Sequence, residues 1–340
     1  MGGSSAAITY LRPCITEAGK ISAETHLAPS SEESANSTLA FYDSARLCWA
    51  LNSSQIFDRV KCSEKLGIAK LDVNGKTIVV SKNGRINVRR AENEQDALKT
   101  TRLASKATWP AMICPTCGKA VLECIAGLCA QCTGRACPLL LRGPPEAAPT
   151  SAKPFKTKTV SEILKELEAS QQSVFNEIKR NLDEAFQTLN CAIVTSSFDD
   201  SLVGVKEAVG TKLEVGKSLA QRLIAHSQRQ TEASAGLALM AIGANLEGLG
   251  HAVCRLRKLV QSHNDSLAAT EAWHIATDGY KTLWTRDPVE DRELAKFYTR
   301  LKRRLSRSKE KPNDDLRKSL EKVVELGLHL SRIVSIHLAV

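Results

Sequence analysis

Six of the eleven cysteines of this 340-residue chain lie in one short segment, between residues 114 and 137. Within it, two Cys-x-x-Cys pairs are separated by a short apolar run, which is expected to form a strand over residues 119–123. Two residues between paired cysteines let both thiolates face one cation, and four such sulfurs form a closed tetrahedron around zinc. The spacing therefore predicts a Zn2+ site with the ligands Cys114, Cys117, Cys129 and Cys132.

Two further cysteines of the segment leave alternatives open. Cys124 either replaces one of these ligands or packs as a small core residue, and Cys137 is spare. An iron–sulfur cluster also uses four thiolates, and a segment without metal is the third interpretation. Four sulfurs with no nearby histidine or carboxylate offer no open coordination position for an activated water. The predicted role of the metal is therefore structural.

Clustering of this kind is typical of metal binding in a reducing compartment, whereas a disulfide framework would spread its cysteines along the chain. The first thirteen residues lack the pattern of a secretory signal. The most apolar stretch, residues 233–254, is interrupted by Asn245, Glu247 and His251 and indicates a buried helix instead of a membrane span. We therefore expect a cytoplasmic protein.

The pattern of apolar residues and turns divides the N-terminal third of the chain into two parts. Residues 1–37 are rich in Ser, Ala, Glu and Thr and predict a flexible arm. Residues 38–110 predict a helix over 38–52, a β-meander, and a helix over 92–107 that ends at Trp109-Pro110. Asn-Gly pairs at 74–75 and 83–84 predict the turns between strands 68–73, 76–80 and 85–88.

The stretch from Gly75 to Ala107 consists of a glycine turn, apolar strands and a helix that starts with Glu92-Asn93-Glu94-Gln95-Asp96. This order resembles half of a TATA-binding-protein repeat, and the following cysteines make the chain similar to an uncharacterised archaeal type in which such a unit precedes a zinc ribbon. Only one repeat is visible, and the phenylalanines that intercalate into DNA in that family are missing from these strands. The resemblance therefore does not imply the family's grip on DNA.

The rest of the chain is predicted to be helical. The zinc-ribbon-like segment covers residues 111–138, and a proline-rich linker covers 139–158. Residues 159–340 begin with a capping box, Thr159 to Glu162, and continue with apolar residues at steps of three and four. We expect five or six helices, some coiled-coil-like, with Trp273, Tyr280 and Trp284 as a packing stripe. The predicted fold class is α+β: a small antiparallel meander with helices and a zinc ribbon, then a larger all-α bundle.

Most of the formal charge of +10 comes from one part of this helical region. Residues 296–318 contain ten Lys or Arg and three acidic residues, and we expect a basic helix over 288–311. Clustered cations of this kind suit nucleic-acid phosphates, an acidic protein, a membrane surface, or simply solvent. The predicted nucleic-acid contacts are Arg300, Lys302, Arg303, Arg304, Arg307 and Lys309. Basic residues of the hairpins (Lys76, Lys82, Arg85, Arg89 and Arg90) lack an aromatic platform, which favours backbone over base recognition.

No catalytic motif is present in the sequence. His251 and Cys254 are three residues apart, but no third group that would orient them can be identified. The leading hypothesis is a non-enzymatic zinc-ribbon protein that associates with nucleic acid. The alternatives are an assembly or adaptor factor that self-associates or docks through its helical bundle, and an iron–sulfur redox protein.

Overall fold

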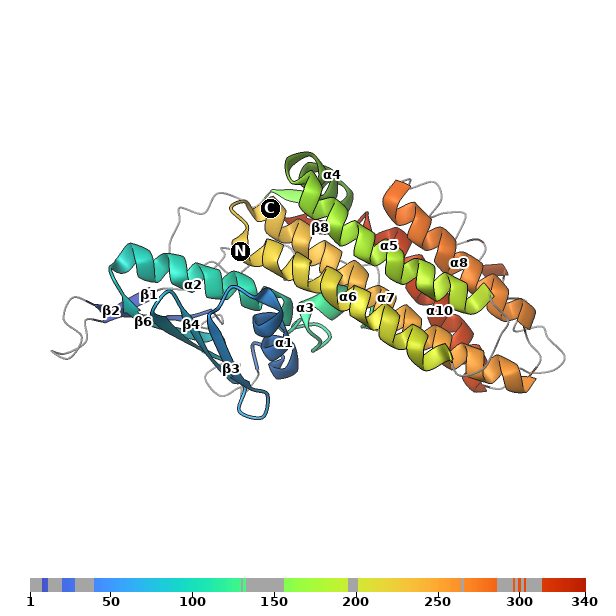
Figure 1. Ribbon diagram of the computed structural model, residues 1–340, viewed down its shortest axis with the longest axis horizontal. Helices are drawn as coiled ribbons and strands as arrows, with labels where there is room; N and C mark the ends of the chain where they lie inside the picture. Colours follow the sequence, from blue (N-terminus) through green and yellow to red (C-terminus); the bar gives the residue numbers. More distant parts are fainter. Residues whose placement is uncertain are drawn as a thin grey trace.

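The computed structural model describes residues 8–11, 20–27, 40–129, 131–132, 156–194, 201–263, 266–285 and 314–340, together with the single positions 296, 299, 300 and 303. Within these ranges the fold is α+β, as predicted. An antiparallel sheet occupies one end of an elongated molecule, a cysteine-bearing loop lies in the middle, and a helical bundle forms the other end (Figure 1).

The sheet has six described strands, and every neighbouring pair is antiparallel. Its order is β1-β2-β6-β5-β4-β3, so the last four strands form a meander. Asn74 and Gly75 both have positive φ, 47° and 73°, at the turn between β4 and β5, and Gly84 has φ 88° at the next turn. Both predicted Asn-Gly turns are therefore confirmed. The strands are β1 Ile8–Leu11, β2 Ile21–His26, β3 Arg59–Ser63, β4 Ile68–Val73, β5 Lys76–Ser81 and β6 Arg85–Ala91.

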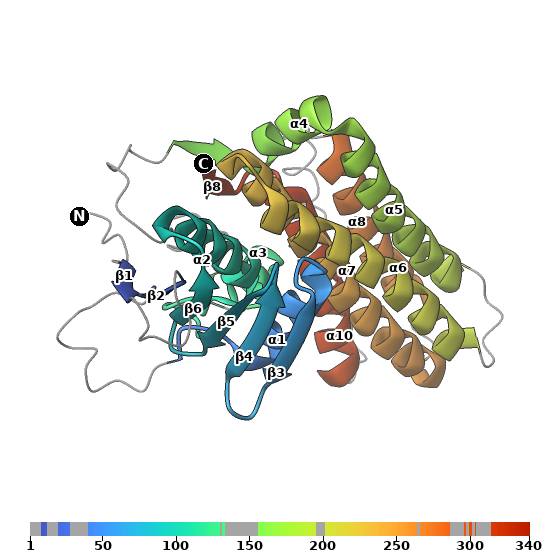
Figure 2. The ribbon, with the colours of Figure 1, turned by 60° about the vertical axis from the view of Figure 1, so that its left-hand side comes forward.

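Helices α1 (Ser44–Ser54) and α2 (Glu94–Thr108) pack on one face of this sheet (Figure 2). Alternate strand residues such as Leu71 and Ile78 are buried beneath them. The Asn93 side chain accepts the backbone N–H of Asp96 and starts α2. The short 3-10 helix η3 (Trp109–Ala111) follows directly, with Trp109 fully buried. Trp109-Pro110 thus ends α2 as the sequence predicts.

The structure differs from the predicted flexible arm at residues 1–37, because β1 and β2 lie in that segment and extend the sheet. The buried side of β2 carries Ala23 and Thr25, which are too small and too polar to produce a clear apolar alternation. Strand β3 was also not predicted, because Val60 and Cys62 alternate with cations. Helix α1 begins after Asp43, and the preceding Tyr42 bridges to Met112 instead of extending the helix.

A disulfide joins Cys48 of α1 to Cys62 of β3, with 5.5 Å between the two Cα atoms. The two cysteines are fourteen positions apart in the sequence and lie outside the cysteine-rich segment. The two sulfurs meet only because α1 packs against β3, and the sequence around either cysteine does not predict this contact. The disulfide attaches α1 covalently to the outermost strand of the meander.

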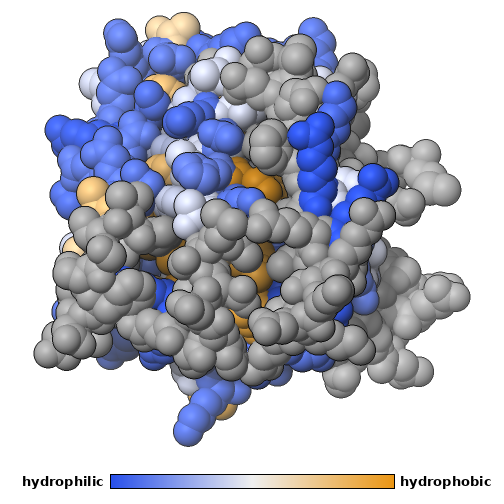
Figure 3. All heavy atoms as spheres, turned by 90° about the vertical axis from the view of Figure 1, so that its right-hand side faces the viewer, coloured by the Kyte–Doolittle hydropathy of each residue, from blue (hydrophilic) through white to orange (hydrophobic). Residues whose placement is uncertain are grey.

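The described part of the bundle contains six long or medium helices, in agreement with the predicted five or six. The Thr159 hydroxyl accepts the Glu162 backbone N–H while the Glu162 carboxylate accepts the Thr159 N–H, which confirms the capping box. Seen from the far end of the bundle, most of the coloured surface at the upper left is hydrophilic, and hydrophobic side chains show between these residues near the centre of the view (Figure 3). The elements are β7 Thr157–Thr159, α4 Val160–Ser170, α5 Gln172–Val194, α6 Ser201–His226, α7 Gln230–His263, α8 Ser266–Thr285, α10 Asp314–Ile333 and β8 His337–Ala339, which pairs with β7.

Helix α7 is the central element of the bundle and contacts α4, α5, α6, α8 and α10. Among the described helices it is the one long and apolar enough to cross a membrane, over Gln230–Leu259 with mean hydropathy 1.3. Its most apolar window is 78% buried inside the protein, as expected for the core helix of a bundle. This burial agrees with the predicted buried helix at residues 233–254.

The predicted aromatic stripe of α8 packs on α5. The Phe186 ring stacks on Tyr280 at 4.0 Å and on Trp273 at 5.5 Å between ring centroids, and Trp284 meets Tyr280 edge to face. The Tyr280 hydroxyl also donates a hydrogen bond of 2.5 Å to Asp183. These contacts confirm a packing role for the stripe.

Two predicted segments lie largely outside the described residues. Of the linker at 139–158, only its last three positions are described, and Thr157 and Lys158 already belong to β7. Of the basic helix predicted at 288–311, Lys296, Arg300 and Arg303 are helical and exposed. The other predicted contacts in it, Lys302, Arg304, Arg307 and Lys309, fall outside the described part of the chain.

Candidate metal centre

The first Cys-x-x-Cys pair forms a tight turn anchored to the start of α1. The Ile113 N–H donates to the Phe41 carbonyl, which places the turn beside the sheet unit. The Gly118 N–H donates to the Cys114 carbonyl at 2.9 Å, and the Cys114 N–H donates to the Lys119 carbonyl at 2.8 Å. Gly118 has φ 68°, a conformation that glycine adopts without strain. The turn directs the Cys114 and Cys117 thiols toward the same point.

The Sγ atoms of Cys114, Cys117, Cys124 and Cys132 all lie within 4.8 Å of one another. The Cys117–Cys124 pair is 3.0 Å apart and the Cys114–Cys132 pair is 3.8 Å apart. A tetrahedral ion with metal–sulfur bonds of about 2.3 Å holds its sulfur ligands about 3.8 Å apart. Three of the four residues are buried and Cys117 is partly exposed. The donor set therefore suits one metal ion: the Cys114–Cys132 separation already has this value, and the closer Cys117–Cys124 pair would widen around the ion.

This ligand set differs from the predicted one at one position, because Cys124 stands where Cys129 was expected. Residues after the first pair form a short helix, α3 (Val121–Ile125), instead of the predicted strand and ribbon. The helical turn carries Cys124 to Cys117. Cys129 is also buried, with 4% exposure, and its charge acts on Cys132, but it is outside the group of four. Cys124 was the open alternative in the sequence, and the helical turn of α3 is what brings it, and not Cys129, into the group of four.

The closeness of the sulfurs and their burial shift the pKa values of two of these cysteines. Burial raises the pKa of Cys132, and so do its hydrogen bonds with Cys117 and Cys114 and the nearby charge of Cys129. Burial also acts to raise the pKa of Cys117, but hydrogen bonds from Cys124 and the Lys119 backbone outweigh it and lower the value. Because the pKa of Cys132 is raised, a metal ion that binds this residue as a thiolate would release a proton.

The loop after Cys124 is fastened to the bundle by a buried histidine of α10. Nε2 of His329 lies 2.8 Å from the Ile125 carbonyl, which only accepts hydrogen bonds, so Nε2 carries the proton. Burial lowers the pKa of His329; the Ile125 hydrogen bond opposes this, and the charges of Arg332 and Lys322 add to the lowering. Folding therefore favours the neutral form of the ring.

We expect His329 to make the protein less stable in acid. Its folded pKa lies below its unfolded value, so the stabilisation is present above the unfolded pKa and is lost as pH falls below it. Because the amide of glutamine can still donate to Ile125 but does not titrate, His329→Gln should lose less stability between pH 7 and pH 5 than the wild type. Denaturant unfolding at a series of pH values measures this difference, and identical pH slopes would contradict it.

Comparisons with known proteins add no further assignment. No protein-family model matches the sequence, and no curated protein or solved structure is significantly similar to it. The resemblance to a TATA-binding-protein half repeat therefore stays a prediction. What can be said of the centre follows from its geometry: four cysteines that suit one metal ion.

Proposed function

We propose that this chain is a non-enzymatic zinc protein that binds nucleic-acid backbones. In this proposal the metal stabilises the fold, and the basic residues contact the phosphates. Zinc is favoured over an iron–sulfur cluster because the four sulfurs lie close enough to surround a single ion. In a cluster, several metal ions separate the thiolates. With four sulfur ligands, a tetrahedral ion has no open position for a substrate.

The uncovered face of the sheet, opposite α1 and α2, carries the observation that supports nucleic-acid binding. We call it the open face. Its outward side chains come from alternate strand positions and include five cations and two acids among the described strands. They are Arg59, Lys61, Lys70, Arg85 and Arg89, with Glu24 and Asp72. Arg85 pairs with Glu24 at 2.7 Å, which leaves the positive charge concentrated on β3, β4 and the end of β6.

Lys61 and Lys70 are directly opposite each other on β3 and β4, and both are exposed. Like charges in this position destabilise an antiparallel pair. Within the described chain neither lysine forms an ion pair. A row of phosphates along the open face would neutralise this repulsion and release counterions. The repelling lysine pair is the single observation that favours a polyanion as partner.

The open face also fits backbone recognition. Its apolar outward residues are Ile68 and Val79, and the described strands place no aromatic ring there on which a base could stack. Contacts to phosphate position a protein on nucleic acid without reading its sequence. We therefore propose contact with little sequence preference, with the basic residues of 296–318 as a second region of phosphate contacts.

A charge-reversal series tests this proposal. The triple variant Lys61→Glu, Lys70→Glu and Arg89→Glu should weaken binding of fluorescent single-stranded and duplex oligonucleotides at least about tenfold and reduce the salt slope by about 2 to 3. The matched control Lys99→Glu, Lys165→Glu and Lys258→Glu has the same change in net charge at exposed helical positions. Equal losses in both triples, or no binding by the wild type, would refute the open face as the contact surface.

A further inference from the structure

The segment that follows Cys124 enters the bundle between α7 and α10. A Cβ atom on Gly248 of α7 would lie 2.8 Å from Leu128, and a Cβ atom on Gly127 would lie 2.4 Å from the His329 ring. Gly127 also has φ 72°, so a side chain there is excluded by both space and backbone conformation. The chain between two metal ligands is thus closely packed against both helices.

Two buried side chains of the bundle bind consecutive backbone carbonyls in this segment. Asn245 of α7, fully buried, donates from Nδ2 to the Ala126 carbonyl at 2.8 Å and to the Leu326 carbonyl of α10 at 3.3 Å. His329 of α10 donates from Nε2 to the Ile125 carbonyl at 2.8 Å. These are the first two carbonyls after Cys124, so α7 and α10 together determine where α3 ends.

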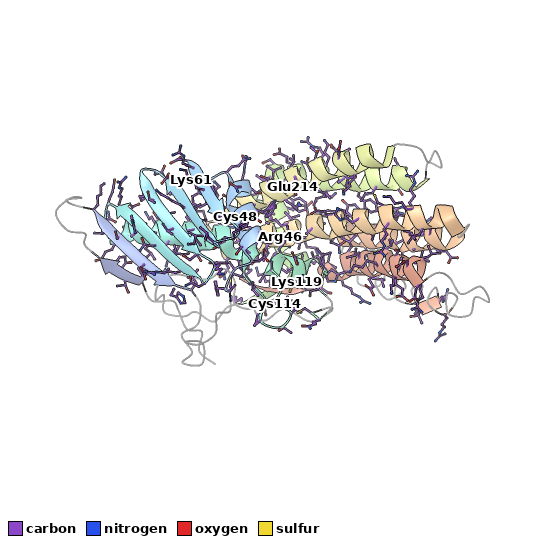
Figure 4. All side chains as sticks on the ribbon, turned by 90° about the horizontal axis from the view of Figure 1, so that it is seen from below. Arg46, Cys48, Lys61, Cys114, Lys119 and Glu214 are labelled. Atoms are coloured by element: carbon purple, nitrogen blue, oxygen red, sulfur yellow. A yellow bond between two sulfur atoms is a disulfide. The ribbon has the colours of Figure 1, made fainter. Side chains whose placement is uncertain are left out.

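The other side of α3 is held by the sheet unit. Arg46 of α1 pairs with Glu123 through Nε at 3.2 Å, one residue before Cys124. In Figure 4, Arg46 lies where the sheet unit meets the bundle, with Glu214 of α6 on one side of it and Lys119 and Cys114 on the other. Trp49 of α1 donates to Glu214 at 3.1 Å, which joins α1 to the bundle independently of the cysteines. The cysteine loop therefore lies between the sheet unit and the bundle and contacts both.

We propose that Asn245 and His329 are positioning residues for the metal centre, and that metal binding in turn stabilises the packing of α7 and α10. This inference rests on the metal site of the proposed function but not on nucleic-acid binding. By fixing the carbonyls of Ile125 and Ala126, the two side chains hold the end of α3 where the Cys124 sulfur faces that of Cys117. We call the hydrogen bonds of Asn245 and His329 to these two carbonyls the clamp. Coupling between two sites is reciprocal, so if the clamp increases metal affinity, bound metal stabilises the clamp by the same free energy.

The effect of the two side chains on metal binding is tested by measuring zinc affinity in competition with a chromophoric chelator. Asn245→Leu keeps the side-chain size but removes the donor, and it should weaken zinc binding about 10- to 100-fold, the range found for groups that orient metal ligands. His329→Gln, which keeps a donor, should bind within about threefold of the wild type. The control Tyr280→Phe loses the buried hydrogen bond to Asp183 elsewhere in the bundle and should leave zinc affinity unchanged.

The effect of bound metal on the packing of α7 and α10 is tested by hydrogen exchange on the wild-type chain, without any variant. Removal of zinc by a chelator should reduce protection around residues 245–249 and 326–330 more than in α5. If the wild type binds zinc but Asn245→Leu binds it equally tightly, or if exchange rises uniformly over the bundle, the clamp is overturned while the metal site stands. If the wild type binds no zinc, both the metal site and the clamp fail.

Discussion

Replacing Cys114 with serine is expected to abolish stoichiometric zinc binding and to lower the free energy of unfolding by an amount on the order of 5 kcal/mol. The residue is fully buried and its sulfur lies 3.8 Å from that of Cys132. Because the unfolded chain has no preformed site, the free energy of metal binding adds directly to folding. Metal analysis of purified protein and denaturant unfolding with and without a chelator measure the two effects.

Three further cysteine variants complete this test. Cys191→Ser, at an exposed position of α5, should keep both the metal and the stability. Cys124→Ser should behave like Cys114→Ser, whereas Cys129→Ser should retain one ion per chain because its sulfur is outside the group of four. Retention of metal by Cys124→Ser together with its loss from Cys129→Ser would restore the ligand set expected from the spacing alone. Wild-type protein without metal would remove the centre altogether.

Replacing Gly279 with alanine is expected to destabilise the protein by at least about 3 kcal/mol, because α8 and α10 touch backbone to backbone at this point. A Cβ atom on Gly279 would lie 2.0 Å from the Gly327 carbonyl oxygen, and one on Gly327 would lie 2.5 Å from the Ala276 Cα. No side-chain rotation relieves a clash with backbone, so the two helices must separate. Thermal and denaturant unfolding measure the loss.

Gly210→Ala in α6 is the matched control for this substitution. An added Cβ there meets nothing within 4 Å, so alanine should raise stability by about 1 kcal/mol through its higher helix propensity. Equal effects of the two substitutions would mean that the α8–α10 contact adds no cost of its own. A stable Gly279→Ala variant would contradict the close approach of these helices.

Features that depend on neighbours in the sequence could be predicted from the sequence. The Asn-Gly turns follow from the backbone freedom of Asn74 and Gly75, and the start of α4 follows from the Thr159–Glu162 capping box. The α+β class and the aromatic stripe of α8 follow from the periods of two and of three to four residues. Each of these signals lies within one element, so no knowledge of packing is needed.

Features that depend on contacts between distant elements could not be predicted in this way. Strand β2 is weakly apolar by itself and belongs to the sheet only because β6 supplies its hydrogen-bond partners. The Cys48–Cys62 disulfide depends on α1 crossing β3, and the open face becomes basic only when β3 and β4 bring Lys61 opposite Lys70.

The metal centre shows both kinds of information at once. The Cys-x-x-Cys spacing was sufficient to predict a sulfur-rich site, because two residues between cysteines direct their thiolates to one point. The helical turn of α3 places Cys124, and not Cys129, in the group of four sulfurs, and Asn245 and His329 bind its last carbonyl groups from helices more than a hundred residues away in the chain. Local sequence thus determines which chemical groups are available, and the tertiary packing determines which of them meet.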